Sequence, residues 1–227
     1  MRKILSVLSV LAVAMVAPNA YAINLVTNGS FEIGAPSGGC QAGATSLSGW
    51  TVTAGNIDID SATPGCSGIT PADGTYFVDL TGSWSNDVGA IAQDITTAIG
   101  TQYNLSFYFT GNPQWQVGAG CASGYANDGA TKAMRVTAGA VTQTFSVDTT
   151  GASCVSPQWT LENVLFTATS TTTTLLFQSL NGATAASVYG PLLDGVSVNV
   201  APVPEPATLG MLVLGIAGLG FARRRKI

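Results

Sequence analysis

Apolar and polar residues alternate with a period of two in short runs between residues 23 and 200, a pattern that favours β-strands and leaves little sequence for helices. The clearest run is 103–110, where every second residue is aromatic or leucine, and 57–60 and 196–200 repeat the pattern. Further strands are expected at 75–80, 90–95, 134–138, 141–147, 159–167 and 173–179. Glycine-containing turns separate these runs. About ten short strands in one domain predict an all-β fold, a single jelly-roll β-sandwich.

The net charge of the domain limits the classes of partner that it can bind. Residues 23–203 contain 11 acidic residues but only 2 basic ones, Lys132 and Arg135, a net charge of −9. Such a domain repels phosphate backbones, so no nucleic-acid partner is expected. The complete absence of histidine excludes Ser-His-Asp and Cys-His catalysis as normally built, and every His-ligated metal site. The composition suits calcium or neutral ligands such as sugars.

The N-terminus reads as a secretory signal peptide over residues 1–22. Arg2 and Lys3 provide a charged start, an apolar stretch follows, and Ala20-Tyr21-Ala22 forms a small-x-small cleavage site. The alternative is a retained membrane anchor, for which the stretch is short. Cleavage would leave a mature β-sandwich domain over residues 23–200.

Residues 201–227 form a three-part tail. A VPEP segment containing Pro204, Glu205 and Pro206 precedes an apolar run at 207–222, and the chain then carries RRRK. The run is short for a permanent membrane helix and contains four glycines. Its basic end would stay on the cytoplasmic side, which leaves the domain outside. A plain tail anchor is the alternative interpretation.

This tail resembles the PEP-CTERM sorting signal. The resemblance implies a Gram-negative bacterial protein that an exosortase cleaves near Pro204, Glu205 and Pro206. It further implies a transient anchor in the inner membrane, followed by a place at the cell surface or in the extracellular matrix. Proteins with this tail are typical of bacteria that secrete exopolysaccharide and form biofilms.

Four cysteines in an exported chain predict two disulfides, for which three pairings are possible. Pairing Cys40 with Cys66 and Cys121 with Cys154 is favoured, because each pair brackets loop-rich sequence within one half of the domain. Metal binding by four thiolates is the competing interpretation, but the sequence contains no CxxC spacing.

Two motifs at the ends of the domain carry a second resemblance. Residues 24–32 read NLVTNGSFE and residues 189–198 read YGPLLDGVSV. Together with the order of the segments between them, they resemble galactose-binding-domain-like β-sandwiches, including carbohydrate-binding modules. The same order resembles the bacterial choice-of-anchor C proteins and the plant cell-wall family numbered 642 among domains of unknown function.

The resemblance also implies a structural calcium ion. In related modules an opening glutamate and an aspartate of the last strand help to bind it, and the matching residues are Glu32 and Asp194. The paired aspartates of the family are Leu193-Asp194 in this sequence, which leaves a single carboxylate. The alternative is that Glu32 and Asp194 are solvated edge residues. Asp58 and Asp60 share one face of their strand, where solvation is favoured over a second metal site.

Two tryptophans are candidates for a ligand surface. Trp84 and Trp115 both lie in polar loop sequence, where an apolar ring is unusual and could stack on a sugar. Core packing is the alternative. No motif singles out a catalytic carboxylate pair, so we expect a non-enzymatic, exported glycan-binding or adhesive protein that meets extracellular polysaccharide. A structural envelope protein without a specific ligand is the alternative, and a glycosidase is a third possibility.

Overall fold

The computed structural model describes residues 23–83, 88–116, 121, 129–181 and 188–202. Within these ranges the chain forms eleven β-strands and one short 3₁₀ helix, η1 (Pro113–Trp115). Among the described residues there is no helix long and apolar enough to cross a membrane. The predictions for the signal peptide, for Trp84, for the cleavage segment Pro204, Glu205 and Pro206, and for the apolar run 207–222 lie outside the described residues.

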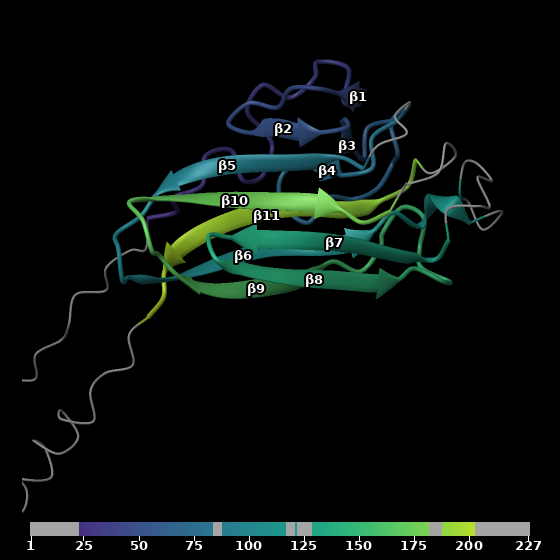
Figure 1. Cartoon of the computed structure of the whole chain (residues 1–227). Coiled ribbons are helices and arrows are strands. Elements are labelled where there is room, and N and C mark those ends of the chain that lie inside the picture. The colour runs from purple at the N-terminus through teal and green to yellow at the C-terminus, as the bar shows by residue number, and fades with distance from the viewer. Residues whose placement is uncertain (1–22, 84–87, 117–120, 122–128, 182–187, 203–227) are drawn as a thin grey trace, which may run out of the picture.

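The strands form two packed antiparallel sheets, as Figure 1 shows. The six-stranded sheet has the order β1 (Gln41–Ala44), β3 (Ile57–Ser61), β4 (Tyr76–Asp79), β11 (Pro191–Val200), β6 (Gln102–Gly111) and β9 (Thr160–Thr167). The five-stranded sheet has the order β2 (Thr51–Ala54), β5 (Ala90–Thr96), β10 (Thr172–Ser179), β7 (Thr131–Ala138) and β8 (Val141–Asp148). The chain therefore folds as the single all-β sandwich of the jelly-roll kind that the alternation predicts.

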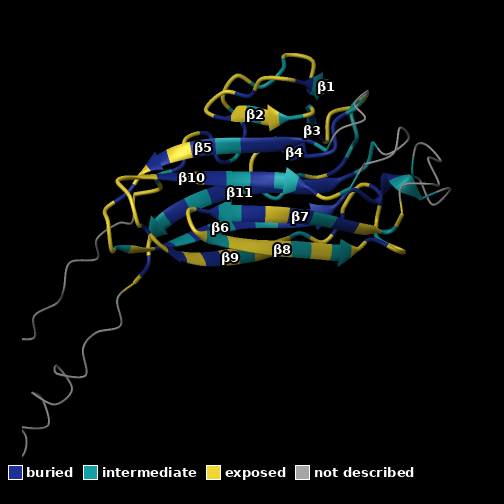
Figure 2. Cartoon of the chain, viewed as in Figure 1, coloured by how far each residue is buried: buried dark blue, intermediate teal, exposed yellow. Residues whose placement is uncertain are grey.

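The hydrophobic core lies between the sheets and is built from the apolar positions of the alternating runs. In β6, Leu105 and Phe107 are fully buried, and Phe107 meets Phe177 of β10 across the interface with ring centroids 5.3 Å apart. An edge-to-face aromatic pair of this kind adds to the stabilisation that burial provides. Figure 2 shows the contrast between the buried strands β10 and β11 and the edge strand β8, much of which is exposed.

The predicted runs coincide with β3 to β11, but the sequence did not predict two strands. β1 and β2 have four residues each and no strong apolar alternation. Partners define them instead, since β1 pairs with β3 and β2 pairs with β5. The last strand also begins earlier than the expected start at residue 196, because the apolar residues from Pro191 to Leu193 already pair with β6.

Both disulfides have the favoured pairing. Cys40 bonds Cys66 and Cys121 bonds Cys154, with Cα–Cα distances of 5.7 and 5.3 Å. They close loops with sequence separations of 26 and 33 residues. Restricting the unfolded chain in this way stabilises a domain by about 3–4 kcal/mol per bond in the chain-entropy model. The Cys40–Cys66 bond also fixes the loop after β3 beside the start of β1.

Candidate functional site

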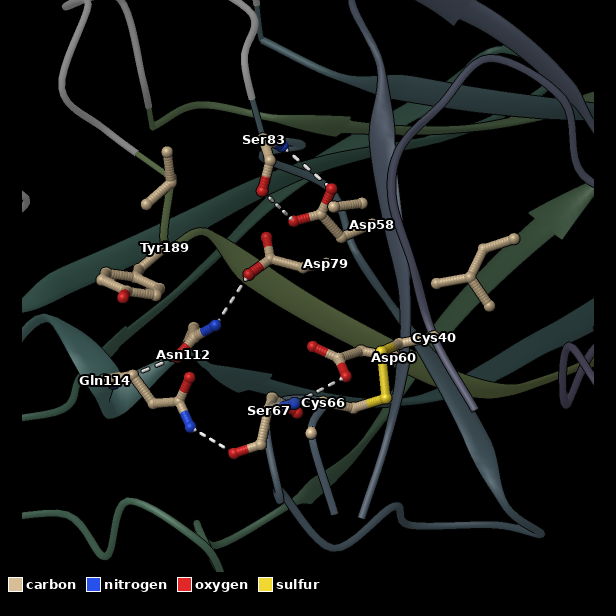
Figure 3. A pocket seen from close by; sticks show the side chains of 14 residues that line it. Cys40, Asp58, Asp60, Cys66, Ser67, Asp79, Ser83, Asn112, Gln114 and Tyr189 are labelled. Atoms are coloured by element: carbon tan, nitrogen blue, oxygen red, sulfur yellow. Dashed lines mark hydrogen bonds between the residues drawn. A yellow bond between two sulfur atoms is a disulfide. The ribbon is translucent and has the colours of Figure 1, made fainter. Parts of the chain in front are cut away.

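A pocket of about 340 Å³ lies at the end of the six-stranded sheet where β11 begins (Figure 3). Its walls come from β3, β4, the segment around η1 and the residues just before β11. It is lined by three aspartates, two amides, two serines, a tyrosine, the disulfide and small or aliphatic residues: Cys40, Ala42, Asp58, Ile59, Asp60, Gly65, Cys66, Ser67, Asp79, Ser83, Asn112, Gln114, Val188 and Tyr189. We call it the acidic pocket.

Strand alternation places the carboxylates in this pocket. Ile57 and Ile59 of β3 face the core, so Asp58 and Asp60 face the opposite side of the sheet. Asp79, at the end of β4, lies directly opposite Asp58 in the antiparallel register. Neighbouring strands thus place two carboxyl groups side by side, an arrangement that disfavours ionisation of both at once.

Asp79 is the most deeply buried of the three, with a side chain only 2% exposed. Its Oδ1 accepts the backbone N–H of Thr81 at 2.8 Å, and its Oδ2 accepts Nδ2 of Asn112 at 2.9 Å. The N–H of Gly190 reaches both oxygens, at 3.1 and 3.2 Å. Burial, and secondarily the charge of Asp58, raise the pKa of Asp79 to about 8.

Asp58 and Asp60 have different partners. Oδ1 of Asp58 accepts N–H groups from Gly43 and Ser83, and its Oδ2 accepts the Ser83 hydroxyl. Burial nevertheless raises the pKa of Asp58. Oδ1 of Asp60 accepts the N–H groups of Ser61 and Ser67, at 2.8 and 2.9 Å. Its Oδ2 receives no hydrogen bond from the described residues.

The amide side chains form the opposite wall. Oδ1 of Asn112 accepts the N–H of Gln114 and caps η1, while Nδ2 of Asn112 holds Asp79. Nε2 of Gln114 donates to the carbonyl oxygen of Ser67, which ties η1 to the disulfide-bonded loop. Amides, carboxylates and hydroxyls in one cavity can accept and donate hydrogen bonds to a polar ligand such as a sugar.

The predicted tryptophan Trp115 does not line this pocket, although its neighbour Gln114 does. Trp115 is half-buried, and its Nε1 donates to Oγ1 of Thr149 at 2.7 Å. Its role in ligand contact stays a prediction. Trp50, by contrast, packs in the core, 6% exposed.

Glu32 and Asp194 both accept hydrogen bonds from the backbone of the segment 72–76. Oε1 of Glu32 accepts the N–H groups of Thr75 and Tyr76, at 2.7 and 2.8 Å. Glu32 is aimed there by a turn in which the buried Phe31 has a φ of 62°, a conformation rarely adopted by bulky residues.

Asp194 is fully buried. Its Oδ2 accepts N–H groups from Ala72 and Asp73, and its Oδ1 accepts that of Gly195. Burial raises the pKa of Asp194 to about 7. Oδ2 of Asp194 thus accepts two N–H groups and Oδ1 accepts one, so Oδ1 keeps a lone pair for a further partner.

A second hollow, of about 470 Å³, is lined by Glu32 and Asp73 but not by Asp194. Among the described residues, the only group of three Cys, Asp or Glu side chains with ligand atoms within 4.8 Å of one another is Cys40, Asp60 and Cys66. The two cysteines of that group form the disulfide. Calcium binding by Glu32 and Asp194 stays a prediction.

Sequence comparison identifies the family. Residues 24–199 match the family described as "Protein of unknown function (DUF642)". The chain belongs to the DUF642 family. Residues 202–226 of this DUF642 protein match the PEP-CTERM protein-sorting motif, which indicates export through a transient membrane stage. No curated protein matches the sequence.

Several solved structures are similar to the DUF642 chain. A structure of TmCBM61 in complex with β-1,4-galactotriose is 17% identical, with a TM-score of 0.47, and the match covers 79% of this chain and 100% of that one. A family 35 carbohydrate-binding module from Clostridium thermocellum is 15% identical, with a TM-score of 0.37 and coverage of 66% and 92%. A CBM35 from Paenibacillus barcinonensis is 14% identical, with a TM-score of 0.38 and coverage of 71% and 98%.

The sequence did not single out the acidic pocket. Asp58 and Asp60 were expected on a solvated face, but they are half-buried in the wall of a cavity. Asp79, Asn112 and Gln114 were not predicted at all. A signal for Asp79 was present, since it is an acidic residue inside the otherwise apolar run 76–80.

Proposed function

We propose that this DUF642 protein is an exported, non-catalytic glycan-binding protein that holds extracellular polysaccharide in the acidic pocket. The observation that carries the proposal is the lining of that pocket, where carboxylates, amides and hydroxyls surround a cavity of about 340 Å³ beside the ring of Tyr189. Sugar-binding sites need such directional polar groups together with an apolar surface against the ring.

The proposal includes the route by which the protein reaches its ligand. The PEP-CTERM motif supports processing by an exosortase at the membrane, and then display at the cell surface or release into the matrix of a biofilm. Two disulfides suit such an oxidising location.

A binding role is favoured over a hydrolytic one by the hydrogen bonding of Asp79. A glycosidase needs a protonated carboxyl group that reaches the glycosidic oxygen. Both oxygens of Asp79 accept structural hydrogen bonds, and only 2% of the side chain is exposed.

The test is a glycan array probed with the exported protein and with the variant Gln114→Ala. Loss of one ligand hydrogen bond should weaken binding about three- to tenfold. Gln143→Ala, at an exposed position of β8 in the other sheet, is the matched control and should bind like the wild type. A folded protein that binds no glycan would support the structural envelope role instead, and cleavage of a bound oligosaccharide would contradict the non-catalytic assignment.

A further inference from the structure

Two side-chain oxygens of the acidic pocket differ from the others. The carboxylate and amide oxygens of Asp58, Asp79 and Asn112 each accept at least one hydrogen bond from the protein. Oε1 of Gln114 and Oδ2 of Asp60 line the same pocket but accept none from the residues that the structure describes. An amide oxygen and a carboxylate oxygen can only accept, so a partner at either position has to supply the hydrogen.

The oxygen of Gln114 gives the stronger indication of a ligand, because this side chain is only 8% exposed. Its Nε2 donates to the carbonyl oxygen of Ser67, and this bond fixes the orientation of the amide, since a carbonyl can only accept. Figure 3 shows the amide oxygen turned away from Ser67, toward the side of the pocket that Asn112 and Tyr189 form. A buried acceptor without a donor costs stability, so an acceptor of this kind beside a cavity indicates that a donor enters the cavity.

One residue positions both acceptors. The backbone N–H of Ser67 donates to Oδ1 of Asp60 at 2.9 Å, and the carbonyl oxygen of Ser67 accepts Nε2 of Gln114. The remaining oxygens of the two side chains therefore flank the backbone of a single residue, where groups of one small ligand can meet both. The disulfide of Cys66, the preceding residue, holds this segment in place.

The side-chain donors of the pocket already have partners. The two serine hydroxyls and the two amide nitrogens in its lining all donate to protein oxygens. Asp79 has hydrogen bonds to both of its oxygens and is 2% exposed, so it forms the floor of the pocket and not a contact surface. A ligand that meets the wall formed by Gln114 and Asp60 therefore has to donate hydrogen bonds, and a hydroxyl group can do so without carrying a charge.

We propose that the acidic pocket selects glycans through free hydroxyl groups and rejects the same glycans when these hydroxyls are O-acetylated. This inference rests on the proposed glycan-binding function and specifies its substrate class. One sugar hydroxyl donates to Oε1 of Gln114, and a second donates to Oδ2 of Asp60. An acetyl ester has no hydrogen to donate, so an acetylated sugar places ester oxygens against two acceptors and leaves both without a donor.

The experiment measures by calorimetry how neutral tetrasaccharides of glucose, galactose and mannose bind to the exported protein. Each tetrasaccharide is used unmodified, O-acetylated, and with fluorine in place of one hydroxyl at each ring position in turn. Fluorine is similar in size to a hydroxyl but cannot donate a hydrogen bond. For the tetrasaccharide that binds most tightly, acetylation should raise the Kd at least about tenfold, and fluorine should raise it about tenfold at the two contacting hydroxyls only.

Two variants test the two contacts. In Asp60→Asn the amide oxygen can keep the bonds from Ser61 and Ser67, while an N–H donor takes the place of Oδ2. Because the variant offers no acceptor there, the Kd increase that fluorine causes at one of the two positions should fall below about twofold. Gln114→Met removes the amide at similar side-chain length and should have the same effect at the other position. Asp94→Asn removes a carboxylate from an exposed position of β5 in the other sheet and should leave both fluorine effects intact.

The outcomes separate this inference from the proposed function. Equal Kd values for the unmodified and acetylated forms would overturn the selection by hydroxyl donors and leave glycan binding in place, and so would acetylation that weakens binding when no fluorine substitution does. A glycan array on which the protein binds only acylated or anionic glycans would overturn it in the same way. Fluorine effects that persist in both Asp60→Asn and Gln114→Met would place the contacting hydroxyls elsewhere and also overturn the inference. Binding of none of the tetrasaccharides, together with a blank array, would overturn the proposed function itself.

Discussion

The buried carboxyl group of Asp79 predicts an unusual dependence of stability on pH. Burial and the neighbouring charge of Asp58 raise its pKa from 3.8 to about 8 in the folded protein. The unfolded chain therefore releases this proton near pH 4, whereas the folded domain keeps it until about pH 8. We expect the free energy of unfolding to fall as the pH rises through this window, and Asp79→Asn to remove that contribution.

The size of the effect follows from proton linkage. Between the two pKa values the folded state binds one more proton than the unfolded state, so stability falls by about 1.4 kcal/mol per pH unit. Over the full window the loss reaches about 6 kcal/mol. Typical domains have only about 5–15 kcal/mol of stability in total, so the effect is large enough to dominate the pH profile. The pKa of Asp194 is raised to about 7, so this residue also makes the free energy of unfolding fall as the pH rises.

The assay is urea denaturation with intact disulfides at several values between about pH 5 and pH 8. Asp79→Asn loses one acceptor for Asn112 or Gly190, which lowers stability by about 1 kcal/mol at every pH. The quantity to compare is the loss of unfolding free energy per pH unit. In the variant this loss should be smaller than in the wild type by about 1.4 kcal/mol per pH unit. Asp148→Asn is the control, because Asp148 is exposed and hydrogen bonds from Thr150 lower its pKa.

Two results would refute the reasoning. The first is a wild-type stability that stays constant or rises between about pH 5 and pH 8. The second is an Asp79→Asn variant with the same slope as the wild type, which would assign the proton uptake to another group.

Two further predictions concern calcium and the sorting tail. If Glu32 and Asp194 bind calcium in the native state, a chelator should lower the melting temperature, since calcium at one hundred times its Kd stabilises by about 2.7 kcal/mol; a melting curve indifferent to chelator would contradict the site. If an exosortase cleaves the tail, mass spectrometry of protein from the cell surface should find a C-terminus near residues 204–206. Peptides from 209–223 in that material would contradict cleavage.

The sequence was sufficient to predict the strands whose own residues alternate. Leu105 and Phe107 need no partner to indicate a half-buried strand, and the expected run at 103–110 lies within β6. β1, with the sequence QAGA, has no such signal, because pairing with β3 is what makes it a strand. Elements defined by a partner distant in sequence cannot be predicted from a local pattern.

The acidic pocket could not be predicted from the sequence, for a similar reason. Alternation correctly places Asp58 and Asp60 on one face of a strand, but it cannot show what covers that face. The covering comes from the loop that Cys66 holds and from η1, which carries Gln114. Asp79 enters the site through its register with β3, a relation that appears only when the sheet is assembled.

Strand β11 joins the two ends of the domain. Tyr189, just before the strand, lines the acidic pocket, whereas Val198, near its other end, accepts a hydrogen bond from Leu25 at the start of the domain. The sorting motif begins at residue 202, immediately beyond this strand. Ten residues of β-strand extend about 33 Å. A tether at the C-terminal side therefore attaches the sandwich at the end of β11 that lies opposite the pocket. The pocket is then about one strand length away from the attachment surface, beyond molecules that pack close to that surface.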